Sequence, residues 1–317
     1  MPTEAGAVLA AVRRGPERPS VAPGRLLLRR FRRHRLALAS GVLLALLVLA
    51  SLSAPLAAAW LGLDPNAVDL LARFAPPSPA HPLGTDELGR DLLLRLLHGG
   101  RISLFVGLVG ALAAAGLGSL IGVVAGYLGG RTDAMLMRLT DGVIALPLLP
   151  LLIVLAAVDL TKLGLPAALA QSESASLWRI LAIVALSGWT TVARLVRGST
   201  LSVRAHDFIR AAVAQGAGPI RIMARHVLPN VVSPVIVATT LSVGNVILTE
   251  SVLSFLGLGI QPPLPSWGNM LTNAQELIWQ APALAVYPGL LIFATVIAFN
   301  FLGDGLQDAM DPRASEP

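Results

Sequence analysis

Residues that could carry out chemistry are sparse in this sequence. The five histidines, at positions 34, 81, 98, 206 and 226, are dispersed and match no metal-ligand spacing. The absence of cysteine excludes disulfides, thiolate zinc sites, iron–sulfur clusters and cysteine nucleophiles. No glycine-rich phosphate loop, nucleophile elbow or HExxH pair occurs. We therefore expect no catalytic residue, no metal site, no cofactor bound by this chain and no ATP hydrolysis by it.

The most structured polar segment covers residues 206–230. Asp207 can cap a short helix that ends near Gly216. Pro219 suits the first turn of a second helix, which we expect Pro229 to close. An ordinary connecting loop is the simpler alternative, but two capped helices with an apolar face need a partner to cover that face. The candidate contact residues are Asp207, Phe208, Ile209, Arg210, Ala211, Ala212, Gly216, Ile220, Leu228 and Pro229.

Composition identifies the solvent around this segment. The apolar set AVILMFWYC makes up 55% of the 317 residues, and charged residues make up 13%, about half of the roughly 25% usual in soluble domains. So few charges cannot cover a soluble protein of this size. The net charge of +6 is divided into clusters between apolar runs, whereas a nucleic-acid footprint would be one basic face. We interpret the chain as an all-α integral membrane protein that binds lipid and no nucleic acid.

Long runs without charge divide the chain. The first run is too long, and lies too far from the N-terminus, to be a cleaved secretory signal. The predicted parts are a cytoplasmic basic N-terminal tail at 1–35, a first transmembrane helix at 36–60, an external segment with an amphipathic helix at 61–101, a five-helix core at 102–302 that contains a cytoplasmic loop at 194–229, and a cytoplasmic C-terminal tail at 303–317.

Three of these elements carry more specific expectations. The amphipathic helix of the external segment places Asp91 and Arg95 as a pair on its polar face. The third span covers 135–158 and contains two prolines, and the fourth has only 180–193 free of charge, so that its flanking arginines must snorkel. In the second span, small residues recur every four positions and predict close helix packing. The packing residues are Gly118, Gly122, Gly126 and Gly130.

Glu250 lies well inside the fifth apolar stretch, and a carboxylate within a membrane is a functional hypothesis by default. No Lys, Arg or His accompanies it within an apolar run as a relay partner. Ser251 and Ser254 follow closely. We therefore retain Glu250 as a candidate intramembrane polar site and favour a structural role in which it bonds to serine or backbone groups.

The distribution of basic residues sets the orientation. With six spans and an internal N-terminus, the cytoplasmic side holds nine arginines of the N-terminal tail, Arg131, Arg138, six arginines of the 194–229 loop and Arg313. Six basic residues remain outside, and the cytoplasmic excess is the pattern of the positive-inside rule. Those six are Arg73, Arg90, Arg95, Arg101, Lys162 and Arg179.

The 206–230 segment resembles the "EAA" loop of permease subunits of binding-protein-dependent ABC importers. The resemblance rests on Ala211-Ala212, three further residues, Gly216, a later isoleucine and Leu228-Pro229. Several other blocks, in order, look like the C-type permease of dipeptide and oligopeptide importers. These blocks are His81–Asp91, Ala125–Gly130, Ser254–Pro263, Pro265–Met270 and Leu302–Leu306.

The resemblance implies the six-helix type I ABC importer permease fold, with cytoplasmic N- and C-termini, in a bacterial inner membrane. It implies half of a pathway for a di- or oligopeptide, delivered by an extracytoplasmic substrate-binding protein. The partners would be a homologous B-type permease and cytoplasmic ATPase subunits, which would hold the ATP and magnesium. Closure of the ATPases would draw the loops together and switch the pathway between two states.

One position departs from the family pattern. Arg210 stands where the motif usually has glutamate, in the first turn of a helix whose dipole disfavours a positive charge. The glutamate's ion pair is therefore not carried over, and we expect an acidic or purely apolar partner surface there.

Alternative functions remain at this stage. The same scaffold could carry a nickel chelate, haem or glutathione. An independent ion-coupled transporter would need mid-membrane binding groups and usually an inverted repeat, and a membrane enzyme would need clustered polar residues in its spans; neither pattern is visible.

The arginine distribution predicts the outcome of a tag-accessibility experiment. A protease-sensitive tag at residue 5 or 315 should be cleaved only from the cytoplasmic side, and one near Gln171 or Gln261 only from outside, because the basic clusters stay inside. The measurement is cleavage in right-side-out and inverted vesicles. A terminus that is cleaved from outside would mean that a span has been miscounted.

Overall fold

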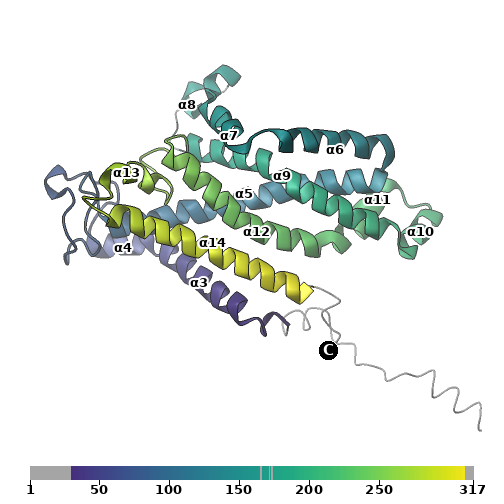
Figure 1. Ribbon diagram of the computed structural model, residues 1–317, viewed down its shortest axis with the longest axis horizontal. Coiled ribbons are helices and arrows are strands. Elements are labelled where there is room, and N and C mark those ends of the chain that lie inside the picture. Colours follow the sequence, from purple (N-terminus) through teal and green to yellow (C-terminus); the bar gives the residue numbers. More distant parts are fainter. Residues whose placement is uncertain (1–29, 165, 171, 173, 311–317) are drawn as a thin grey trace, which may run out of the picture.

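The computed structural model describes residues 30–310 except 165, 171 and 173, and these residues form a bundle of long helices (Figure 1). No β-strand occurs in the described part of the chain. The predicted all-helical membrane class is confirmed, since five helices are long and apolar enough to cross a membrane. They are α3 (Arg35–Leu52), α5 (Leu92–Leu128), α9 (Ala175–Arg204), a continuous helix over Pro219–Phe255, and α14 (Ala283–Met310).

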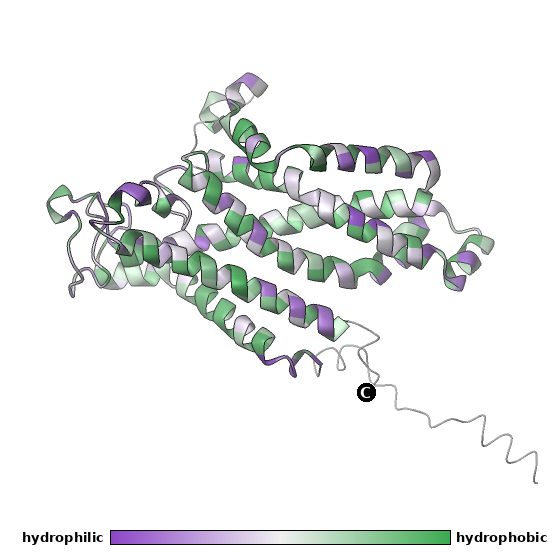
Figure 2. Ribbon diagram, viewed as in Figure 1, coloured by the Kyte–Doolittle hydropathy of each residue, from purple (hydrophilic) through white to green (hydrophobic). Residues whose placement is uncertain are grey.

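Shorter elements gather toward the ends of the bundle. Figure 2 shows apolar residues along the long helices and more hydrophilic residues near the two ends. Toward one end lie α4 (Ala54–Leu61), η1 (Leu70–Ala72), η2 (Leu160–Leu163), α8 (Ala167–Ala170), η4 (Asn269–Leu271) and α13 (Ala274–Leu277), and at the opposite end lies α10 (Asp207–Ala214). The predicted tails at 1–29 and 311–317 lie outside the described residues.

The third predicted span is broken rather than straight. Helices α6 (Gly130–Ala145) and α7 (Leu148–Ala157) meet at 89°. Leu146 between them is extended, with φ −73° and ψ 136°, because the ring of the following Pro147 disfavours helical backbone in the residue before it. Counted as one crossing, this pair brings the number of candidate spans from five to six.

The amphipathic helix expected before residue 101 does not exist as a separate surface element. Helix α5 begins at Leu92, capped by the Asp91 carboxylate, and continues through the membrane span. Arg95 is buried and pairs with Asp86 at 3.3 Å instead of with Asp91. The prediction was wrong because it took Arg95 for a solvated charge, whereas the preceding loop supplies a carboxylate that neutralises it.

The first and last spans also differ from their predicted bounds. The run at 36–60 is divided at Ser53, where α3 ends and α4 begins with Pro55 in its first turn. Proline lacks the N–H group that a continuous helix would need. At the other end of the chain, residues 303–310 were predicted as a tail, but α14 continues to Met310.

Helix α9 is longer than its charge-free core at 180–193. It runs to Arg204, and two of its arginines find partners on α6. Arg197 binds both carboxylate oxygens of Asp133, and Arg194 binds Asp141. These two ion pairs fasten α6 to the end of α9 nearest α10.

Helices α5 and α9 touch through their backbones. A Cβ atom at Gly118 would lie 2.5 Å from the Trp189 carbonyl oxygen, and one at Gly122 would lie 2.6 Å from that of Ala193. Gly126 similarly faces Thr200. Only glycine permits this approach, as in other small-residue helix contacts. Gly130 does not belong to the stripe, because it opens α6 and nothing lies within 4 Å of its Cβ position.

The glycine contact predicts unequal effects of two alanine substitutions in α5. Gly122→Ala should lower the free energy of unfolding by roughly 1–3 kcal/mol, because its methyl group overlaps a backbone oxygen. Gly116 has no atom within 4 Å of its Cβ position, so Gly116→Ala should instead raise the free energy of unfolding by about 0.5–1 kcal/mol through its higher helix propensity. The check is the thermal unfolding midpoint of both purified variants in one detergent. Equal midpoints would contradict the close contact.

Candidate functional site

Helix α10 stands at the end of the bundle, between α9 and the helix that begins at Pro219 (Figure 1). His206 occupies the N-cap, although its side chain caps no N–H group of α10, so the predicted cap by Asp207 is wrong. Asp207 lies instead in the first turn, where its carboxylate pairs with the guanidinium of Arg210. Both side chains are exposed, which makes this pair weak.

The end of α10 is a Schellman turn. The Ala217 N–H donates to the Ala212 carbonyl at 3.1 Å, and the Gly216 N–H donates to that of Val213 at 2.9 Å. Gly216 has φ +82°, a conformation that glycine adopts at little cost. Gly218 has φ −70° and needs no such freedom. The turn directs the chain from α10 into Pro219.

The second helix of the segment does not end at Pro229. Helix α11 (Pro219–Ile222) continues through a π turn, η3 (Met223–Val227), into α12 (Leu228–Phe255). Pro229 sits in the first turn of α12 and follows the π turn, in which the Leu228 N–H donates to the Met223 carbonyl five residues earlier. The predicted loop at 194–229 is therefore mostly helix, and α10 connects directly to a helix that crosses the bundle.

Part of the apolar face of α10 has a partner within the chain. Ile209 is 3% exposed and Ala212 is 8% exposed, and both pack into a cluster that we call the α10-end cluster. Its buried members are Ala115, Val123, Val192, Val196, Ile209, Ala212, Ile222, Val227 and Val231. The expectation of a wholly unpartnered face was wrong, because α5 and α9 extend far enough to cover it.

The remaining apolar residues of the segment face outward. Phe208 is 42% exposed, Val213 is 54% exposed and Ile220 is 79% exposed. Beside Val213 lies an open hollow of about 430 Å³ that Arg204 and Arg210 also line, and the guanidinium of Arg204 lies 5.9 Å from the ring centre of Tyr127. We call Phe208, Val213, Ile220, Arg204 and Arg210 the α10 surface. It combines apolar contact area with positive charge and is suited to binding a protein partner.

Glu250 is fully buried near the opposite end of α12. Its Oε1 atom accepts hydrogen bonds from the hydroxyls of Ser254 at 2.6 Å and Ser266 at 2.8 Å. The Ser251 hydroxyl donates to the Ile247 carbonyl of its own helix. The favoured structural role thus has Ser254 as one partner, while no sequence pattern pointed to Ser266.

Ser266 belongs to a buried turn that closes this end of the bundle. The Trp267 backbone N–H donates to the Ser103 hydroxyl at 3.0 Å, and its indole donates to the Leu96 carbonyl at 2.9 Å. Both acceptors lie on α5. Asn269 links the same turn to the chain before it through the Leu264 carbonyl. Glu250 and Trp267 together fasten the turn to α12 and α5.

A second polar cluster precedes α5. The Asp86 carboxylate binds the guanidinium of Arg90 at 2.7 Å and faces that of Arg95. Asp91 accepts a bond from the Leu94 N–H and contacts the Nδ1 atom of His81 at 3.0 Å. These partners are all within the chain, so this motif shapes the loop that leads into α5. Among the described residues, no three His, Asp or Glu side chains are placed to hold a metal ion.

Comparison with known proteins reveals close relatives. Residues 118–316 match the model of the family described as binding-protein-dependent transport system inner membrane component. Residues 22–77 match the N-terminal transmembrane domain of oligopeptide transport permease C.

Three relatives align over most of their length. A protein of Brucella suis named as a peptide permease is 40% identical over 90% of this chain and 89% of its own. The oligopeptide transport system permease protein of Bacillus subtilis is 35% identical over 90% of this chain and 88% of its own. A glutathione transport system permease protein of Pectobacterium atrosepticum is 38% identical over 92% and 91%.

The Glu250 bonds predict different effects of two substitutions. Glu250→Leu should lower the free energy of unfolding by roughly 1–3 kcal/mol, because it leaves the buried hydroxyls of Ser254 and Ser266 without their acceptor. Glu250→Gln keeps an acceptor oxygen, so it should lower the free energy of unfolding by less than Glu250→Leu. Thr239→Val is the matched control on the same helix, since that buried hydroxyl bonds to the Val235 carbonyl of its own helix. The measurement is the thermal unfolding midpoint in detergent, and a Glu250→Leu variant as stable as Thr239→Val would contradict the assignment.

Proposed function

The chain belongs to the family of binding-protein-dependent transport system inner membrane components, and from this premise we propose that it forms one half of the membrane pathway of an ATP-driven importer of di- or oligopeptides. The family match and relatives up to 40% identical over nearly the whole chain support the permease assignment. The observation that carries the mechanism is the helix over Pro219–Phe255, which runs without interruption from the turn after α10 to the Glu250 end of the bundle.

We propose six membrane crossings, with the bent α6–α7 pair as the third and both termini in the cytoplasm of a bacterial cell. The beginning of α3, the end of α14 and α10 all lie toward one end of the bundle (Figure 1), which supports this topology. The same end carries most of the arginines, as expected of the cytoplasmic side. The chain would thus reside in the inner membrane.

The α10 surface is the proposed contact with a cytoplasmic ATPase. Phe208 and Val213 supply exposed apolar area, while Ile209 and Ala212 fix α10 to the bundle. Arg210 is already paired with Asp207, so the reversal of charge at this position does not demand an acidic partner. This favours an apolar contact, with Arg204 available for an acidic group at its edge.

The proposed assembly contains a second, B-type permease, the ATPase subunits and an extracytoplasmic substrate-binding protein. ATP and magnesium would bind to the ATPase subunits, and this chain would contribute no catalytic group. Movement of the ATPases would displace α10, and the continuous helix would carry that displacement to the opposite end of the bundle. The assembly is then a two-state device biased by contacts outside the membrane.

A peptide is the proposed substrate in preference to a nickel chelate or haem. The names of the relatives described above specify peptides, oligopeptides or glutathione, itself a small peptide. Glu250 gives no support to an ion-coupled carrier, because it is buried and bonded to two serines.

Reconstitution tests the proposed function. The purified chain should hydrolyse no ATP, and ATP-driven uptake of a tripeptide should appear only in proteoliposomes with the second permease, the ATPases and the binding protein, because the chain has no phosphate loop. Mass spectrometry of the ligand that co-purifies with the binding protein identifies the substrate. ATP hydrolysis by the isolated chain would contradict the proposal, and a non-peptide ligand would contradict the substrate.

The turn at the end of α10 predicts a contrast between two valine substitutions. Gly216→Val should weaken ATPase co-purification and abolish uptake, because a β-branched residue is strained at φ +82° and the Schellman turn would be lost. Gly218→Val is the matched control, with φ −70° and open space around it, and should leave both unchanged. Membrane insertion of both variants is confirmed by immunoblot. Normal docking and uptake in Gly216→Val would show that α10 is only a connector.

A further inference from the structure

A cavity lies where the bent α6–α7 pair faces α9 and α12. Its volume of about 470 Å³ falls within the roughly 300–1,000 Å³ of small-ligand pockets. The bend at Leu146 supplies apolar lining, and no charged side chain takes part. The polar lining comes from two helices. It consists of Ser187, Thr190 and Thr191 of α9 and Ser242, Asn245 and Thr249 of α12.

The polar groups of this cavity are only partly used by the chain. The hydroxyls of Ser242 and Thr249 donate to carbonyls of their own helix at 2.7 and 2.8 Å. Their oxygen lone pairs stay available to accept hydrogen bonds. The Asn245 side chain is exposed and has no hydrogen-bond partner among the described residues. The wall therefore presents several acceptors and one amide that can both donate and accept.

An unbonded amide is costly in lipid. Transfer of such a group from water to an apolar medium costs roughly 2–7 kcal/mol when no hydrogen bond replaces those to water. Asn245 lies within a candidate membrane span, so its side chain needs water, a polar ligand or a polar group of a partner subunit. This requirement distinguishes the cavity from ordinary lipid-facing surface.

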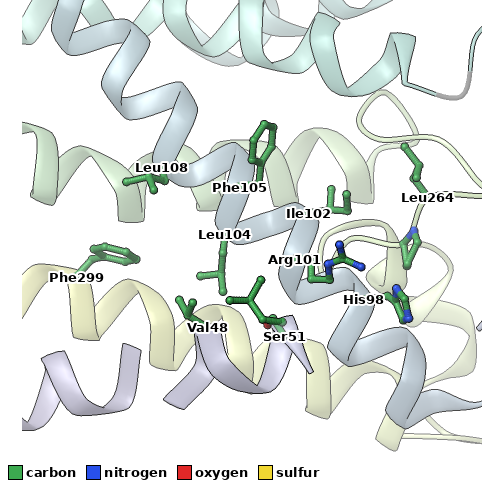
Figure 3. A pocket seen from close by; sticks show the side chains of 12 residues that line it. Val48, Ser51, His98, Arg101, Ile102, Leu104, Phe105, Leu108, Leu264 and Phe299 are labelled. Atoms are coloured by element: carbon green, nitrogen blue, oxygen red, sulfur yellow. The ribbon is translucent and has the colours of Figure 1, made fainter. Parts of the chain in front are cut away.

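A larger cavity of about 620 Å³ between α3, α5 and α14 has a different lining (Figure 3). Val48, Leu108 and Phe299 represent its mostly apolar wall. Of its polar side chains, His98 and Arg101 lie together toward one end (Figure 3), and the His98 Nε2 atom is buried without a hydrogen-bond partner among the described residues. Away from that end, hydrocarbon satisfies the wall without a specific ligand.

We propose that the cavity at the bend is this chain's wall of the translocation pathway and that it binds the peptide backbone. The Asn245 amide would pair with a backbone N–H and C=O of the substrate, and the hydroxyl oxygens would accept further N–H groups. A wall without charge does not select among charged side chains, so one pathway would admit peptides of varied sequence. This inference rests on the proposed function and specifies which groups of the chain meet the substrate.

Thiol labelling tests whether the cavity holds water. The chain has no cysteine, so Asn245→Cys and Thr191→Cys each place one thiol in it. In the assembled transporter, a charged methanethiosulfonate reagent should modify both at least about tenfold faster than Leu290→Cys on α14, because the reaction needs a hydrated thiolate. Addition of trialanine together with the binding protein should slow the modification of both thiols. The mass of this chain reports the modification.

Uptake of trialanine tests the role of the amide. Asn245→Leu should reduce ATP-driven uptake by about tenfold, the equivalent of one lost hydrogen bond. Thr240→Val is the matched control on the same helix, because its hydroxyl bonds to the Ile236 carbonyl and does not line the cavity. Both variants should retain the second permease and the ATPases on purification.

The outcomes separate this inference from the proposed function. Absence of thiol labelling in the assembled transporter would overturn the inference. Loss of the second permease during purification of Asn245→Leu would also overturn it. Either result would instead identify Asn245 as a contact between the two permeases. Unchanged uptake by Asn245→Leu would also overturn it. A third outcome is that both thiols are labelled but the unsubstituted transporter carries no trialanine. The peptide substrate would then be wrong in the proposed function and in this inference. The permease assignment would still be tested separately, by reconstitution with the second permease, the ATPases and the binding protein.

Discussion

The backbone contact between α5 and α9 is the constraint on which the rest of the molecule depends. Gly118, Gly122 and Gly126 allow the two helices to approach until a Cβ atom on α5 would overlap α9. The α10-end cluster takes Val123 from α5 and Val196 from α9, so it exists only while these helices stay together. In a membrane, where apolar burial gives little drive for association, such tight packing is the main source of helix contact.

The polar interactions lie at the two ends of this packed pair. At the α10 end, Arg197 and Asp133 hold α6 against α9. At the other end, Glu250 and Trp267 hold the closing turn against α12 and α5. One continuous helix joins the two regions. A partner that moves α10 therefore acts on a helix that reaches the opposite end of the bundle, which supports the proposed transfer of movement from an ATPase to the pathway.

Sequence patterns correctly predicted those features that depend only on neighbouring residues in the same helix. Apolar runs located the spans, and the four-residue recurrence of Gly118 to Gly126 located the helix contact, because both depend on helical period alone. The pattern failed where distant residues decide. Arg95 is buried only because Asp86 folds against it, and Ile209 is buried only because α9 extends beyond its predicted span and packs beside α5. Likewise, no spacing rule connects Glu250 with Ser266, whose hydrogen bond depends on how the intervening loop returns to α12.

The central claim is that α10 and the bundle move as one body. Spin labels introduced at Ala214 on α10 and Leu120 on α5, both exposed and in a chain without cysteine, report the distance between them by pulsed electron resonance. The assembled transporter in nanodiscs would be measured without nucleotide and with ATP and vanadate. Rigid attachment predicts the same distance distribution in both states. A distribution that shifts when the ATPases close would show that α10 moves as a free arm and would contradict the account.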